Sequence, residues 1–131
     1  MELDAEKREN KISAVVLDAA IAVHNALGPG LLEKAYEACL AFELTSRGLA
    51  VQTQVPLPIT YRGVLLDVAY RIDLLVEDLV VIELKAVDKL APLHEAQLIS
   101  YLKLSNKKLG LLINFHVVRL KDGYKRIVNG L

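Results

Sequence analysis

The stretch YRIDLLVEDLVVIELKA, residues 70–86, holds two apolar runs with a polar break between them at residues 77–78. Runs of this length and composition predict two β-strands, over about residues 68–76 and 79–86. The polar break predicts a short turn between them, so that the two strands can pair side by side. This segment decides the fold, because the remaining elements can be arranged around a sheet that contains it.

Charged side chains interrupt the second apolar run. Successive side chains along a strand face opposite ways, so Glu83 and Lys85 lie on one face, two residues apart. The other face is filled by three apolar side chains, Val80, Ile82 and Leu84. Buried charges are costly unless they are paired or bind a metal. The pattern therefore indicates that the polar face is kept for chemistry.

Helical patterns precede this region. Apolar residues between positions 12 and 26 recur at the three-and-four spacing of a helix, which Gly28-Pro29-Gly30 ends. A second helix is predicted from about Leu31 to Arg47, because Gly48 is placed to stop it. Its predicted buried positions are Leu32, Ala35, Cys39 and Phe42.

Strand patterns and one more helix account for the rest of the chain. The prolines at 56 and 58 favour an edge strand, since proline cannot donate to a strand ladder. The remaining predicted elements are strands at 51–58, 109–115 and 124–128, a hairpin over 59–66, and a helix over 92–104. The order predicts an α/β fold with a mixed central β-sheet flanked by helices, in one domain spanning residues 1–131.

Composition limits the class of protein. The chain has 131 residues, 53% of them hydrophobic, and no apolar run of the ~20 residues that a membrane span needs. Cys39 is the only cysteine, which fits a reducing cytoplasm and predicts a small core side chain. Net charge is zero, yet residues 101–131 hold seven basic side chains against one acidic. That segment could attract phosphate or could be an ordinary solvated surface.

Two sets of residues could carry chemistry. If the strands pair through the turn, the carboxylates of Asp73 and Glu83 come close together and would repel unless a cation sits between them. Such oxygen ligands suit Mg²⁺ or Mn²⁺, and Lys85 could then steady developing negative charge. The alternative is an exposed ladder of ion pairs, which contributes little to stability.

The second set lies on predicted helices. His94, Gln97 and Tyr101 share one face of the third helix, where a solvated surface is the simpler interpretation. Glu33 and Tyr36 lie three residues apart near the start of the second helix, where an acid favours the helix dipole.

These motifs resemble a known family. Gly30-Leu-Leu-Glu33-Lys-Ala-Tyr36, Ile82-Glu83-Leu-Lys85 and His94-Glu-Ala-Gln97-Leu-Ile-Ser-Tyr101 are similar to the bacterial GxxExxY protein family. That family is placed within the PD-(D/E)XK nuclease-like superfamily, and the similarity runs from about residue 10 to 128. The resemblance implies a restriction-endonuclease-like core. One departure is Ile72, where the superfamily motif has proline.

The resemblance also implies roles for the matched residues. Asp73, Glu83 and Glu33 would bind Mg²⁺ or Mn²⁺, and together with Lys85 they would be catalytic. Gln97, Tyr101 and Tyr36 would contact the substrate. The implied activity is metal-dependent cleavage of nucleic acid, DNA in preference to RNA.

An alternative of a different class remains open. A silent nucleic-acid-binding or protein-interaction module on the same scaffold would also fit, because zero net charge gives little nonspecific hold on a duplex. No membrane partner is expected. An apolar sheet edge in a domain this small would favour a homodimer.

Overall fold

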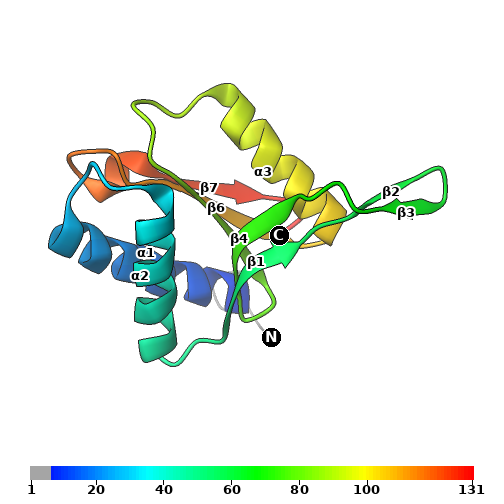
Figure 1. The fold of residues 1–131 in the computed structure, drawn as a ribbon. Helices are drawn as coiled ribbons and strands as arrows, with labels where there is room; N and C mark the ends of the chain where they lie inside the picture. Colours follow the sequence, from blue (N-terminus) through cyan, green and yellow to red (C-terminus); the bar gives the residue numbers. More distant parts are fainter. Residues whose placement is uncertain (1–6) are drawn as a thin grey trace.

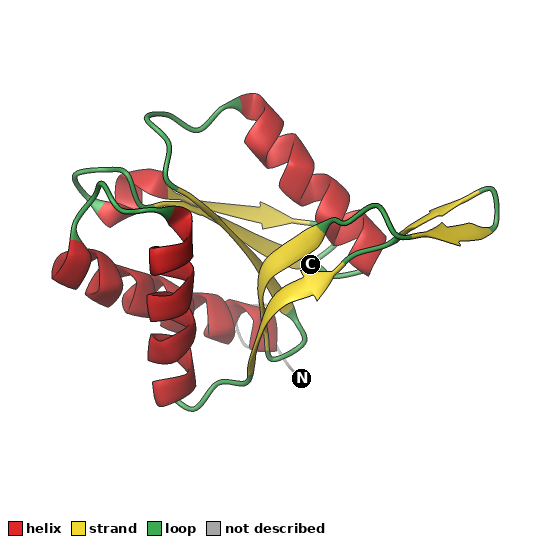
Figure 2. Ribbon diagram, in the orientation of Figure 1, coloured by secondary structure: helices red, strands yellow, loops and turns green. Residues whose placement is uncertain are grey.

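The computed structural model describes residues 7–131, and its fold is a mixed β-sheet with helices on both faces (Figures 1 and 2). The helices are α1 (Arg8–Leu27), α2 (Glu33–Ser46), α3 (Pro92–Ser105) and the short 3-10 helix η2 (Leu120–Gly123). The sheet contains β1 (Val51–Pro56), β4 (Arg71–Val76), β5 (Val80–Lys85), β6 (Leu109–Asn114) and β7 (Tyr124–Val128). A separate hairpin consists of β2 (Ile59–Tyr61) and β3 (Val64–Leu66).

The five strands lie in the order β1-β4-β5-β6-β7. β5 and β6 are parallel and are connected through α3, whereas the other neighbours are antiparallel. β1 lies at an edge, as its prolines predict, and β6 is buried along its whole length, as a continuous apolar run predicts. The predicted α/β fold with a mixed central sheet is confirmed.

Two apolar cores lie on opposite faces of the sheet. One, under α1 and α2, contains the side chains of Val80, Ile82 and Leu84. The other, under α3, contains Val81 and Leu98. Since side chains alternate along β5, the same alternation sends Glu83 and Lys85 toward α3.

The turn between β4 and β5 contains Glu77 and Asp78, as the polar break in the sequence predicts. Their φ angles are 54° and 55°. Two successive residues with positive φ are typical of a type I′ turn, whose twist matches that of the paired strands. The turn fixes the register, in which Leu74 lies opposite Ile82.

The predicted buried face of α2 is wrong. Phe42 is 74% exposed, and Cys39 is exposed, so this cysteine is not a core side chain. The buried residues are instead Tyr36, Leu40 and Leu44. Tyr36 sets this rotation. Its hydroxyl donates to the Gly28 carbonyl at 2.5 Å and accepts the Leu31 N–H at 3.1 Å, and its ring stacks on Phe115 at 4.5 Å.

α3 approaches β6 closely at Gly110. A Cβ atom built at this position would lie 2.9 Å from Cδ1 of Leu98, closer than side chains normally pack. Leu98 is fully buried, so it has little room to move aside. The absence of a side chain at Gly110 therefore sets how near α3 lies to the sheet.

The β2–β3 hairpin projects away from the rest of the molecule (Figure 1). It is a predicted element, with its turn at Arg62-Gly63, and its apolar side chains Tyr61 and Leu65 are exposed. A short connection leads from its base into β4, the strand that carries Asp73. Over residues 7–131, no helix is both long enough and apolar enough to cross a lipid bilayer.

Candidate active site

β4 and β5 separate where their two acidic residues face one another. Their regular pairing ends at Leu74 and Ile82, one step before Asp73 and Glu83 would meet. In place of ladder bonds, the Asp73 N–H donates to Oε2 of Glu83 at 2.9 Å. The Leu84 N–H donates to Oδ2 of Asp73, also at 2.9 Å. The structure thus brings both carboxylates into the gap between the strands.

Glu83 is the most buried acid of this group, with only 4% of its surface exposed. Burial, and next the Asp73 carboxylate, raise its pKa to about 8. The hydrogen bond from the Asp73 N–H and the charge of Lys85 act in the opposite direction but do not offset the increase. At neutral pH, Glu83 therefore carries a proton unless a cation replaces it.

A chain of hydrogen bonds leads from Lys85 to α3. The Lys85 amine donates to Oε1 of Gln97, and Nε2 of Gln97 donates to the Tyr101 hydroxyl, each at 3.3 Å. Burial, and next the Glu83 charge, raise the pKa of Tyr101, so its hydroxyl stays protonated. The helix face predicted from the spacing of Gln97 and Tyr101 thus meets the polar face of β5.

No sequence motif marks Gln54, which lies in β1 opposite Asp73. Its φ is +51°, a left-handed conformation in the middle of a strand. Such a conformation costs a residue with a side chain ~1–3 kcal/mol and persists only where its surroundings hold it. Here Nε2 of Gln54 donates to Oε1 of Glu37 at 2.6 Å and to Oδ1 of Asp73 at 3.3 Å. Gln54 therefore links Asp73 to α2.

Glu37 was also missed by the sequence analysis. Burial raises its pKa, and the charges of Asp73 and Glu33 add to the increase, whereas the Gln54 bond lowers it. No motif marks Glu37, since a partly exposed glutamate inside a helix is common. Only the position of β1 beside α2 shows that it belongs to this group.

Glu33 lies in the first turn of α2 and is exposed. Its charge contributes to raising the pKa of Glu83, so it lies near enough to interact with this acid. Within residues 7–131, however, no three His, Cys, Asp or Glu side chains are grouped closely enough to hold a metal ion. The predicted ligand set of Asp73, Glu83 and Glu33 is therefore not assembled as a three-carboxylate cage.

Tyr36 does not lie where its predicted role requires. It is fully buried, and its hydroxyl is occupied by the Gly28–Leu31 turn. A substrate has no access to it, which corrects the prediction that Tyr36 touches substrate. The position of Tyr36, three residues after Glu33, is explained by packing, because its buried ring fixes the start of α2.

The donor set at the strand gap fits a hard divalent cation. Each carboxylate accepts one backbone N–H, and the second oxygen of Asp73 also accepts the Gln54 amide, so lone pairs remain on both carboxylates for an ion. Mg²⁺ is usually held by one or two carboxylates together with waters and a substrate phosphate. Half-buried Asp73 and buried Glu83, whose pKa is strongly raised, also suit the positive charge that such an ion supplies.

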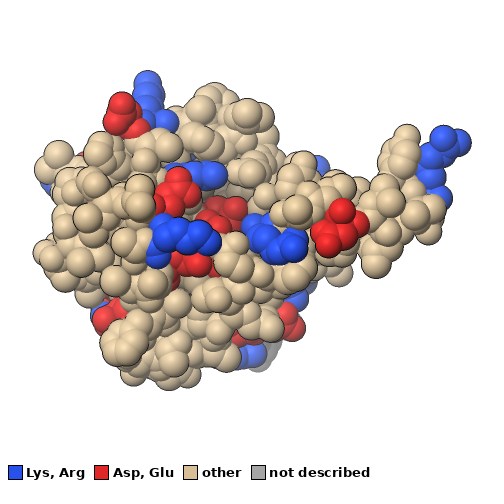
Figure 3. Space-filling model, viewed as in Figure 1, with Lys and Arg blue, Asp and Glu red and all other residues tan. Residues whose placement is uncertain are grey.

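The surface around this group is hollowed. In Figure 3, acidic side chains lie inside a hollow near the middle of the visible face, with Lys and Arg side chains beside them. The hollow lies between the positions that α2 and α3 occupy in Figure 1. The site is thus open to a ligand from this side.

Other polar residues noted in the sequence have structural partners. Nδ1 of His94 accepts the Ala91 N–H at the start of α3, so His94 caps the helix. Several basic side chains of residues 101–131 are paired with acids on different elements, so part of their charge is offset. These pairs are Lys107 with Asp78, Lys125 with Glu95, and Arg119 with Asp122.

Comparison with known proteins gives one finding. A family model described as the PD-(D/E)XK nuclease superfamily matches residues 10–127. Neither the curated proteins nor the solved structures contain a match to this chain. The matched range includes every element that contributes to the strand gap, from α2 to α3.

Proposed function

The chain belongs to the PD-(D/E)XK nuclease superfamily, which supports a nuclease-type function, and from this premise we propose that it hydrolyses DNA with Mg²⁺ or Mn²⁺ bound at the strand gap. Asp73 and Glu83 would hold the ion through the remaining lone pairs of their carboxylate oxygens, together with the Leu84 carbonyl. The ion supplies Lewis acidity at the scissile phosphate and a bound water of lowered pKa.

The chain's own residues position the other reacting groups. Lys85 steadies the attacking water or the negative charge that develops on phosphate. Gln97 holds the Lys85 amine in place, and Tyr101 in turn supports Gln97. Glu33, exposed in the first turn of α2, would orient a water beside the ion.

Gln54 is a positioning residue in this proposal. Its amide donates to one oxygen of Asp73 while the Leu84 N–H binds the other. A carboxylate held at both oxygens keeps one orientation, which a metal ligand needs. The strained backbone of Gln54 is consistent with a residue retained for this purpose.

One observation carries the proposal: the carboxylates of Asp73 and Glu83 replace the strand ladder, and Lys85 extends from the same face. The test is a cleavage panel with single-stranded, double-stranded and branched DNA and with RNA, in Mg²⁺ or Mn²⁺. Lys85→Ala should lower the cleavage rate about 100-fold or more. The matched control is Lys121→Ala, an exposed lysine on η2, which should cleave like the wild type. Full cleavage by Lys85→Ala would refute the assignment.

A silent binding module is the second candidate. Zero net charge and the lack of a three-carboxylate cage within residues 7–131 favour it. Calorimetric titration with Mn²⁺ separates the two functions. Binding that is lost in Asp73→Asn supports the enzyme, whereas no binding at millimolar Mn²⁺ supports the module.

A further inference from the structure

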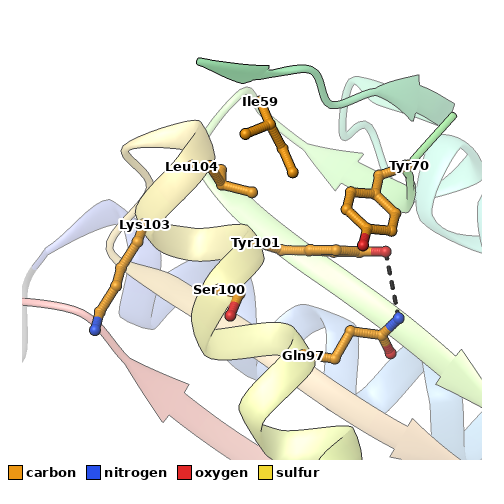
Figure 4. Close-up of a pocket in the computed structure, with 7 residues that line it drawn as sticks. All are labelled: Ile59, Tyr70, Gln97, Ser100, Tyr101, Lys103 and Leu104. Carbon is orange, nitrogen blue, oxygen red and sulfur yellow. Dashed lines mark hydrogen bonds between the residues drawn. The ribbon is translucent and has the colours of Figure 1, made fainter. Parts of the chain in front are cut away.

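A pocket of about 440 Å³ lies between α3 and the base of the β2–β3 hairpin (Figure 4). Its walls include Ile59, Tyr70, Gln97, Tyr101 and Leu104. Volumes in this range are typical of small-molecule sites. The residues come from two segments that are distant in the sequence, so the folded chain creates the pocket.

The walls of this pocket differ in polarity. Ile59 and Leu104 give it an apolar side, and Figure 4 shows both lying beyond one face of the Tyr101 ring. Its polar lining includes Ser100 and Lys103, together with the Gln97 amide and the Tyr101 hydroxyl, which are hydrogen-bonded to each other. A flat heteroaromatic group, with apolar faces and polar edges, matches both kinds of wall.

Tyr70 provides the accessible aromatic surface. It is 43% exposed, whereas Tyr101 is 6% exposed and forms the floor. The two ring centroids lie 5.8 Å apart with an angle of 47° between the planes. Because the rings are tilted and not stacked on one another, the Tyr70 face remains open to a planar ligand.

The pocket adjoins the proposed active site through one side chain. Gln97 lines the pocket and also accepts the hydrogen bond of the Lys85 amine. The Gln97 side chain therefore lies between a ligand in the pocket and Lys85 of the proposed active site. The occupant that fits is a part of the nucleic-acid strand being cut.

Charge supports the same conclusion. The chain has zero net charge, so attraction to the phosphate backbone contributes little to binding. Stacking of a base on an aromatic side chain is independent of net charge and is worth a large factor in affinity. A base in a duplex is stacked on both faces and paired along one edge, so only an unpaired base can enter.

We propose that this pocket binds one unpaired nucleobase of the substrate strand, stacked on Tyr70, with its polar edge toward Gln97 and Tyr101. The substrate class is then single-stranded or frayed nucleic acid. The inference rests on the proposed nuclease function, which it makes more specific.

The test is a binding measurement that requires no cleavage. A fluorescently labelled single-stranded oligonucleotide and a blunt duplex of the same length are titrated by anisotropy in EDTA, with the full chain. Wild type should bind the single strand more tightly. Tyr70→Ala should weaken this binding about 10-fold or more, and Tyr70→Phe, which keeps the ring, should not. The matched control is Tyr61→Ala, which removes another exposed tyrosine ring, on the hairpin and outside the pocket. The affinity of this variant should not change.

A scan with abasic nucleotides makes the test specific. For wild type, removing one particular base should weaken binding at least as much as Tyr70→Ala does. For Tyr70→Ala, removing that same base should cost clearly less than it costs wild type, as expected for two partners of one contact. Parallel DNA and RNA strands show which sugar is preferred.

Three outcomes would overturn the inference: equal affinity for duplex and single strand, equal losses for Tyr70→Ala and Tyr61→Ala, or abasic effects that are unchanged in Tyr70→Ala. None of these depends on catalysis. Loss of the nuclease proposal would appear separately, as cleavage that persists in Lys85→Ala, so the two failures are distinguishable.

Discussion

The burial of Glu83 predicts a pH-dependent cost to folding. A carboxyl group whose pKa rises from 4.5 to about 8 keeps its proton in the folded state while the unfolded chain has already released it. The unfolded state therefore binds fewer protons between these values, and stability falls as pH rises. The favourable contribution of this group is complete below pH 4.5 and is lost by the time pH passes 8.

The size of the effect follows from the same shift. One pKa unit corresponds to ~1.4 kcal/mol, so ionisable Glu83 costs the folded state about 3 kcal/mol at pH 7. Glu83→Gln removes this cost. The glutamine oxygen can still accept the Asp73 N–H, and its amide can face the Asp73 carboxylate. The variant should be more stable than wild type by about 3 kcal/mol at pH 7, with almost no gain at pH 4.5.

Urea unfolding in EDTA at several pH values between 4.5 and 8 measures this difference. Asp122→Asn is the control, because the Asp122 side chain is 65% exposed and its partner Arg119 is an arginine, which stays charged throughout this pH range, so its replacement should give no comparable pH-dependent gain. A Glu83→Gln gain that is the same at pH 5 and pH 8 would refute the reasoning. So would a variant that is less stable than wild type at pH 7.

Three further predictions concern neighbouring residues. Gln54→Gly should be more stable than Gln54→Ala by ~1 kcal/mol in thermal unfolding, because glycine accepts the left-handed backbone while both variants lose the amide; the reverse order would contradict the strain. Millimolar Mg²⁺ should raise the melting temperature of wild type but not of Asp73→Asn, and equal shifts would place the ion elsewhere. Tyr36→Phe should lose ~1 kcal/mol in urea unfolding, since it removes two part-buried hydrogen bonds to the Gly28–Leu31 turn; unchanged stability would contradict the role of Tyr36 in holding this turn.

The positions of the strands along the chain could be predicted from the sequence because the signals for them are local. Apolar runs of strand length, the polar turn and the prolines at the edge each act over a few residues. The positions of Glu83 and Lys85 on one face follow from the alternation of a strand. These features predict the sheet and the part of the site that lies on β4 and β5.

The error in α2 has a different origin. Two sets of positions in this helix have apolar residues at helical spacing, and they differ by a rotation of one residue. The choice between them depends on Tyr36, whose hydroxyl finds two backbone partners in the preceding turn. Helical periodicity carries no information about such a tertiary hydrogen bond, so Phe42 and Cys39 were placed on the wrong side.

Gln54 and Glu37 could not be found because their significance is entirely tertiary. They lie on different elements, 17 residues apart, and meet only because β1 packs beside α2. A positive φ leaves no trace in a glutamine's identity. The sequence predicted the acids at the strand gap but not the amide that holds one of them.

The contact between Gly110 and Leu98 has a consequence for the site, although neither residue belongs to it. Gln97 precedes Leu98 on α3, and its hydrogen bond to Lys85 is already long at 3.3 Å. A methyl group at position 110 would push against the Leu98 side chain, and a shift of α3 in response would lengthen the bond between Gln97 and the Lys85 amine. A substitution at Gly110, which is buried under α3 and outside the exposed cleft, would thus alter the reactivity of the site.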